Sequence, residues 1–147
     1  MTVDTQEIRE LLARRDRGIA AGDAVAAVAP YAQGAVQYDL QPPLEIGFSR
    51  EEATEGVGAW LETWNGPVTS ELKSPEVIVS GDLAVAYGLA NMRGDKKGEG
   101  PSDLWFRSTV VLKKQGGEWR IVHEHSSVPM MMDGSQRAAT DLKPERG

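Results

Sequence analysis

The sequence contains no cysteine, which excludes disulfide bonds, cysteine-ligated zinc and a thiol nucleophile. It also lacks any run approaching the roughly 18 to 20 apolar residues that a membrane-spanning helix needs. Its first residues show no basic segment followed by an apolar one, so we expect no secretory signal. These absences together predict a soluble protein, which we expect to be cytoplasmic.

Basic residues are also scarce relative to acidic ones: 16 Lys and Arg stand against 22 Asp and Glu, for a net charge of -6. Non-specific binding to phosphate requires clustered basic side chains that displace counterions. The composition therefore argues against nucleic acid and against an anionic membrane as partners. Hydrophobic residues make up 40% of the 147, enough for one domain with its own core.

The hydrophobic pattern changes its period near Gly66. Before it, helical spacing or alanine-rich composition predicts helices over residues 5–18 and 24–32 and a third beginning at Arg50, with a short strand over residues 35–40. After it, alternation predicts four strands, over residues 68–79, 83–93, 104–114 and 119–128. Helices followed by an antiparallel meander indicate an α+β fold rather than a parallel α/β fold.

Residues 83–93 form the predicted strand with the clearest difference between its two faces. One face is bulky and includes Leu83, Tyr87, Leu89 and Asn91, whereas the other consists mainly of alanine and glycine. A flat face of this kind accepts another layer at close range. It can be a dimer surface or the seat of a helix from the same chain.

Two segments near the end of the chain, residues 105–109 (WFRST) and 117–129 (GEWRIVHEHSSVP), closely resemble the ending of SnoaL-like proteins. The resemblance continues upstream through residues 38–47, Trp60 and Trp64. This family belongs to the nuclear-transport-factor-2-like superfamily and includes polyketide cyclases and ketosteroid isomerase relatives. The resemblance implies a cone-shaped α+β barrel with N-terminal helices packed on a curved, mainly antiparallel sheet. It also implies a hydrophobic pocket and a homodimer formed through the outer sheet face.

We expect residues 1–132 to form a single SnoaL-like domain and residues 133–147 to be a polar, mobile arm. Family membership alone does not decide the chemistry, because this scaffold hosts isomerases, cyclases, dehydratases and binding modules. The candidate residues must therefore be weighed one by one.

Asp39 is the first candidate for a catalytic base. It stands seventeen positions after Gly22 and in this respect is similar to the base of ketosteroid isomerases. At the mouth of an apolar pocket, desolvation raises the pKa of a carboxyl group and suits it to accept a proton near neutral pH. Alternatively, Asp39 caps the turn before Pro42. The positions matching the isomerase's oxyanion pair hold Arg15 and Leu104, so steroid isomerisation is not expected.

His123 and His125 are one residue apart on a predicted strand, so we expect them on one face, together with Trp119, Ile121 and Ser127. Either imidazole can act as acid or base near pH 7. The alternative is that both fill space and form hydrogen bonds across the sheet. No third ligand follows from the spacing, so we predict no metal.

Arg107 alternates with Trp105, and both should lie beside His123 and Tyr87 if neighbouring strands pair in order. There Arg107 or Tyr87 can stabilise a carboxylate or a developing oxyanion. The alternative is an arginine that pairs with Glu124 or Asp103 at the sheet surface.

Aromatic and polar side chains complete the expected ligand-binding set: Trp60, Trp64, Tyr38, Asn91, Trp105 and His125. Trp60 and Trp64 are one helical turn apart, where they can form a lid. The leading hypothesis is an enzyme without cofactor, an isomerase, cyclase or dehydratase that moves protons on a small hydrophobic molecule. The alternatives are a non-catalytic module that binds an apolar acid and a domain that assembles partners through its sheet.

Overall fold

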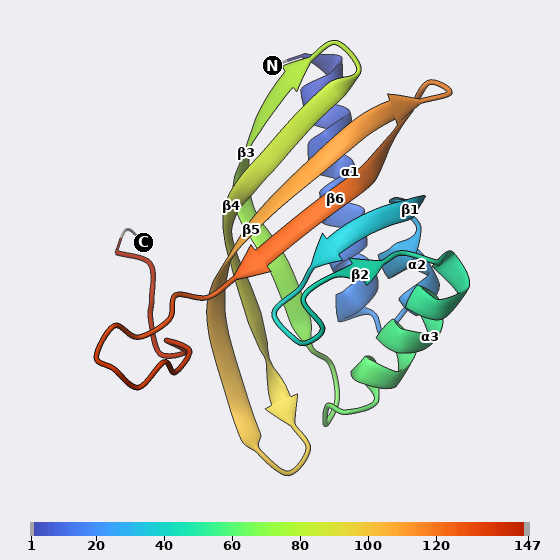
Figure 1. The fold of residues 1–147 in the computed structure, drawn as a ribbon. Helices are drawn as coiled ribbons and strands as arrows, with labels where there is room; N and C mark the ends of the chain where they lie inside the picture. The colour runs from blue at the N-terminus through green and yellow to red at the C-terminus, as the bar shows by residue number, and fades with distance from the viewer. Residues whose placement is uncertain (1, 146–147) are drawn as a thin grey trace.

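The computed structural model describes residues 2–145, which form a curved six-stranded sheet with helices against one face (Figure 1). The elements in chain order are α1 (Val3–Ala20), α2 (Ala24–Val28), β1 (Tyr31–Tyr38), β2 (Ile46–Gly47), α3 (Arg50–Leu61), β3 (Thr69–Ser80), β4 (Leu83–Lys96), β5 (Gly100–Gln115) and β6 (Glu118–Ser127). The predicted α+β class is confirmed. We call the face covered by the helices the concave face and the opposite one the convex face.

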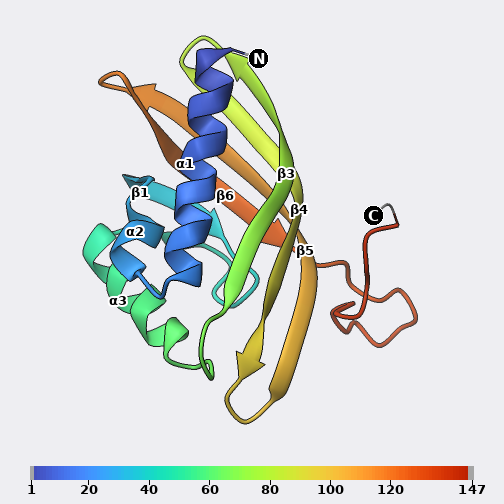
Figure 2. The ribbon, with the colours of Figure 1, turned by 180° about the vertical axis from the view of Figure 1, so that it is seen from behind.

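The strand order is β2-β1-β6-β5-β4-β3, so β2 and β3 form the two edges and the sheet is not closed. Strands β3 to β6 form the predicted antiparallel meander, whereas β1 pairs with β6 in parallel. The helices lie across the concave face, as the reverse view shows (Figure 2).

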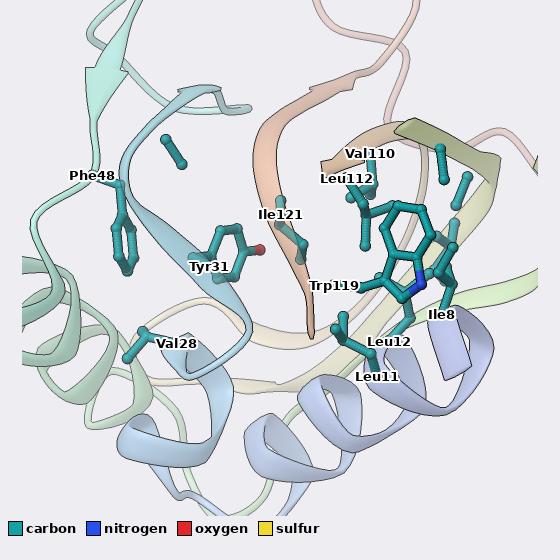
Figure 3. Close-up of a cluster of buried hydrophobic side chains, with 14 of the residues drawn as sticks. Ile8, Leu11, Leu12, Val28, Tyr31, Phe48, Val110, Leu112, Trp119 and Ile121 are labelled. Carbon is teal, nitrogen blue, oxygen red and sulfur yellow. The ribbon is translucent and has the colours of Figure 1, made fainter. Parts of the chain in front are cut away.

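Helix α1 supplies the centre of the core because its apolar residues recur at helical spacing. Ile8 and Leu12 are almost fully buried and cluster with Ala84 and Ala86 of β4. Helix α1 runs closest to the edge strand β3, and the methyl side chains of β4 are buried in the same cluster. The flat face of β4 is therefore buried in the core of its own chain, on the helical side, and is not free to be a dimer surface. Figure 3 shows this cluster, which extends to Val110, Leu112, Trp119 and Ile121.

Strand β6 contains a β-bulge that changes which of its residues face the core. Ile121 pairs with Leu112 and His123 pairs with Val111, so Val122 is an extra residue on β6. One extra residue reverses the alternation that follows it. The expectation that His123 lies on the same face as Ile121 is therefore wrong.

The chain enters β1 earlier than its composition suggests. Helix α2 ends at Val28 and β1 begins at Tyr31, so residues expected at the end of the helix and before the strand belong to the sheet instead. Pairing with β6 explains the difference, because Tyr31 pairs with Ile121 and the carbonyl of Pro30 accepts a hydrogen bond from the Ile121 N–H at 2.9 Å. Pairing with β6 thus overrides the local helix propensity of this segment.

After β6 the chain runs through turns and bends beside the sheet (Figure 1). Ala139 is buried, and Lys143 Nζ lies 3.3 Å from Asp103 Oδ2. The mobility expected for this arm remains a prediction. Within residues 2–145, no helix has the length and hydropathy that crossing a bilayer requires.

Candidate functional site

A cavity of about 710 Å³ lies between the concave face of the sheet and the three helices. Its walls are mainly apolar and include Phe48, Val57, Trp60, Met92 and Phe106. The polar and charged residues that line it are Arg15, Asp16, Gln37, Asp39, Gln41, Ser49, Glu52, Ser70, Glu71, Ser108, Glu124 and Ser126. A concave, mainly apolar space that also presents polar groups is the usual form of a small-molecule site.

Arg15, Tyr31 and Glu124 form a hydrogen-bonded network at one side of this cavity. Glu124 accepts a hydrogen bond from the Tyr31 hydroxyl through Oε1 and from Arg15 Nη1 through Oε2, the latter at 2.9 Å. The side chains of Arg15 and Glu124 are only 10% and 14% exposed. Burial and the nearby Glu124 charge both raise the pKa of Tyr31, so its phenol stays protonated and donates.

Asp16 connects this network to the edge of the sheet. Its Oδ1 accepts from Arg15 Nε at 3.2 Å, and its Oδ2 accepts from the Leu72 N–H at 3.0 Å. Burial raises the pKa of Asp16, while the Arg15 charge opposes that shift. Burial works against the Arg15 cation as well, but Tyr31, Glu124 and Asp16 outweigh it and raise the pKa of Arg15.

Asp39 follows β1 directly and lines the rim of the cavity. Desolvation raises the pKa of Asp39, the Glu124 charge adds to the shift, and a hydrogen bond from the Leu40 N–H opposes it. That bond, 2.8 Å long, reaches Oδ1. Both interpretations of Asp39 thus describe part of the geometry, since one carboxylate oxygen binds the turn and the group also borders the cavity.

Ser108 on β5 lines the cavity with its residue only 4% exposed. Within residues 2–145, its buried Oγ has no hydrogen-bond partner. A buried polar group without a partner costs roughly 1–3 kcal/mol. The cavity wall therefore contains a hydroxyl group able to bind a polar group of a ligand.

Of the ten residues named from the sequence, Asp39 and Trp60 line this cavity. Trp64, expected beside Trp60 in a lid, is buried and packs edge-on against it, with 5.7 Å between ring centroids. Lys96 Nζ lies 4.5 Å from the centroid of the Trp64 ring, so the end of α3 is attached to the β4–β5 hairpin.

The other candidates lie on the convex face, away from the cavity. Tyr87, Trp105 and Arg107 share that face, as their alternation predicts, but the helices cover the opposite one. His123 and His125 join them because of the bulge at Val122.

Specific contacts hold these convex-face residues. Tyr38 packs edge-on against His123 and His125, with centroids 4.8 and 5.2 Å apart. His123 Nδ1 lies 2.6 Å from the Val36 carbonyl oxygen. These contacts match the structural interpretation of the histidine pair.

Arg107 and Asn91 have partners of their own on this side. Arg107 Nε donates to Ser127 Oγ at 3.1 Å, so neither Glu124 nor Asp103 is its hydrogen-bond partner there. Asn91 is buried, and its Nδ2 donates to Asp103 Oδ1 at 2.7 Å. An oxyanion in the cavity is therefore beyond the reach of Arg107 and Tyr87.

Sequence reasoning did not assign a site role to Arg15, Glu124 or Ser108. One signal for Arg15 was available, because it continues the buried stripe of Ile8, Leu11 and Leu12, where a charged residue needs a partner inside. Glu124 had no such signal, since the bulge that turns it inward depends on pairing between strands.

Residues 9–131 match the model of the SnoaL-like domain family, so the chain belongs to this family. A nuclear-transport-factor-2-like protein of unknown function from Pseudomonas putida KT2440 has 32% sequence identity and a TM-score of 0.83, covering 98% of this chain and 99% of that one. No curated protein sequence matches the chain.

More distant structures show the same fold. A ketosteroid isomerase-like protein from Erwinia carotovora atroseptica SCRI1043 has 19% identity and a TM-score of 0.70, covering 86% of this chain and 97% of that one. A proposed dehydratase of the nuclear-transport-factor-2-like family from Streptomyces avermitilis has 12% identity and a TM-score of 0.71, covering 87% and 97%.

Proposed function

We propose that this protein is an enzyme that moves a proton on a small hydrophobic molecule in the cavity, as an isomerase, cyclase or dehydratase, without a cofactor. The observation that carries the proposal is the position of Asp39, a carboxylate with a raised pKa at the rim of an apolar cavity. The fold shared with an isomerase-like protein and a proposed dehydratase supports the same reaction classes.

Asp39 is the base in this proposal. Its carboxylate removes a proton from carbon, the electrons of the C–H bond move toward a neighbouring oxygen, and the proton is returned at another position or used to release water. Water at the rim limits the rise in its pKa, because Asp39 itself is exposed. The ionised form of this carboxylate is the one that accepts the proton.

Arg15 replaces Tyr87 and Arg107 as the group that stabilises the developing oxyanion. It lines the cavity, and Glu124 and Tyr31 hold its guanidinium in place. A fixed cationic donor in a partly dry site stabilises charge that develops only in the transition state.

Hydrogen–deuterium exchange provides the test. A panel of small cyclic and aromatic ketones is incubated in D₂O with the protein, and deuterium uptake beside the carbonyl is followed by mass spectrometry. Asp39→Asn should slow the exchange about a hundredfold or more while ligand affinity changes little. Exchange in the wild type should rise with pH as Asp39 loses its proton.

Asp82→Asn serves as the control, because it removes the same charge from the exposed turn between β3 and β4. Unchanged exchange in Asp39→Asn would remove Asp39 from the mechanism. Ketone binding with no exchange above the control rate would favour the binding-module alternative.

We also propose that the protein is a homodimer in which two convex faces meet. Ile78, Leu83, Tyr87 and Leu89 expose between 44% and 58% of their surface, and all belong to β3 or β4. Exposed apolar side chains on neighbouring strands mark an interaction surface.

A further inference from the structure

Charge around the cavity is strongly unbalanced. Among residues 2–145, Asp16, Asp39, Glu52 and Glu124 line it with a single cation, Arg15, so four acidic side chains face one basic one. Glu71 also borders the cavity but pairs with Lys73, 3.2 Å away, and is not counted. The surplus negative charge arises in a space with apolar walls, where electrostatic fields are focused rather than screened.

The one cation is already engaged by acids. Arg15 binds Glu124 at 2.9 Å and Asp16 at 3.2 Å. It can still donate to a partial negative charge, but its own charge is offset before a ligand arrives. A ligand carrying a full carboxylate would meet Asp39 and Glu52 at the rim without a free cation inside, whereas a cation would be attracted.

The apolar walls suit a cation as well. Phe106, Trp60 and Phe48 all line the cavity, and aromatic faces bind ammonium groups that have been partly desolvated. Phe48 already stacks on Tyr31 and has the Arg50 guanidinium 5.4 Å from its ring centroid. Lys96 Nζ lies 6.0 Å from the ring centroid of Trp60, so within residues 2–145 Phe106 is the ring with no such cation. All three rings also provide the contact area that an apolar ligand body needs.

Ser108 is an independent indication that the cavity is built for a ligand. Its Oγ is buried in the wall and unpaired among residues 2–145, although hydroxyl groups at this depth are normally hydrogen-bonded. A neutral oxygen or nitrogen of a bound molecule would supply the missing partner.

From these observations we infer that the cavity takes a hydrophobic ligand with a protonated amine. The ammonium group binds near Asp39 and Glu52, the apolar body lies along the aromatic walls, and a neutral polar group can reach Ser108. This inference deepens the proposed function, because it names the substrate class for the same cavity.

Three probes with one apolar body test the inference: 2-(1-naphthyl)ethylamine, 2-(1-naphthyl)ethanol and 1-naphthylacetate. Their affinities for the 147-residue protein are measured at pH 7 by isothermal titration calorimetry at low salt. The amine should bind at least tenfold more tightly than the acid, with the alcohol between them. In 0.5 M NaCl the difference in affinity between the amine and the acid should become smaller, because salt screens the charges at the rim.

Glu52→Gln and Glu55→Gln form a matched pair on α3. Both residues are exposed and both changes remove one negative charge, but only Glu52 lines the cavity. Amine affinity should fall about three- to tenfold in Glu52→Gln and stay unchanged in Glu55→Gln, with circular dichroism confirming that both variants fold.

No detectable amine binding, acid binding as tight as amine binding, or equal losses in the two variants would overturn the inference. The readout is independent of turnover. A preference for the amine without any proton exchange would refute the proposed reaction while leaving the ligand class intact. Proton exchange on neutral ketones without a preference for the amine would refute the inferred ligand class while leaving the proposed reaction intact.

Discussion

Arg15 is a buried cation whose partners come from three places in the fold. Asp16 is its neighbour on α1, Tyr31 belongs to β1, and Glu124 belongs to β6. Transferring such groups out of water is costly, and only good hydrogen-bond geometry offsets that cost. The network therefore stabilises the fold only while every member is present, and it keeps the guanidinium beside the cavity.

Replacing Arg15 by methionine should show this dependence. Arg15→Met leaves Glu124 buried without its cation, and we expect the free energy of unfolding to fall by about 3 kcal/mol or more. Urea denaturation followed by Trp fluorescence provides the measurement. Arg17→Met breaks the exposed pair with Glu10 and should cost under about 1 kcal/mol.

Adding Glu124→Gln to Arg15→Met should recover part of the loss, because it removes the unpaired charge. Equal stability of Arg15→Met and Arg17→Met would show that the buried network contributes no more to the free energy of unfolding than an exposed ion pair.

Helices α1 and α2 meet at a glycine that leaves no space for a side chain. A Cβ atom at Gly18 would lie 2.8 Å from the backbone nitrogen of Ala27. The close approach of α2 therefore depends on Gly18, and α2 in turn contributes Ala27 and Val28 to the cavity wall.

Gly18→Ala should destabilise the protein by about 1–3 kcal/mol, because the backbone of α2 must move to admit the methyl group. Gly58→Ala on α3 is the matched control, since a Cβ there meets nothing within 4 Å. It should raise the stability by about 0.5–1 kcal/mol through its higher helix propensity. Thermal unfolding of both variants measures the difference, and a stabilising Gly18→Ala would contradict the close packing.

The two sides of the sheet differ in what they bury and what they expose. The concave side holds the core and the cavity, whereas the convex side exposes large apolar residues of β3 and β4. Such a division leaves the convex side available for a second copy while the cavity stays open.

Leu89→Glu should convert the proposed dimer to a monomer, because it places a charge among the apolar side chains of the interface. Sedimentation velocity at about 50 μM checks the outcome. Val25→Glu is the control, since Val25 is 68% exposed but belongs to α2, on the helical side. It should leave the dimer intact. A monomeric wild type at this concentration would contradict the proposed dimer.

Much of the architecture follows from the sequence by itself. The change of period near Gly66 predicts helices before a meander, and the ending around residues 117–129 identifies the family. Alternation also places Tyr87 and Arg107 on one face, and the position after the first strand places Asp39 at the rim. These features depend on local periodicity or on short motifs, which a sequence displays directly.

Tertiary structure decided which residues face the cavity. Alternation shows that Tyr87 and Arg107 share a face, but the burial of Ala84 and Ala86 in one core with α1 determines that this face is the convex one. The bulge at Val122 arises from pairing between β5 and β6, and it turns Glu124 inward to meet Arg15, 109 positions earlier. Contacts at such separation depend on how the elements assemble, so local pattern could not reveal them.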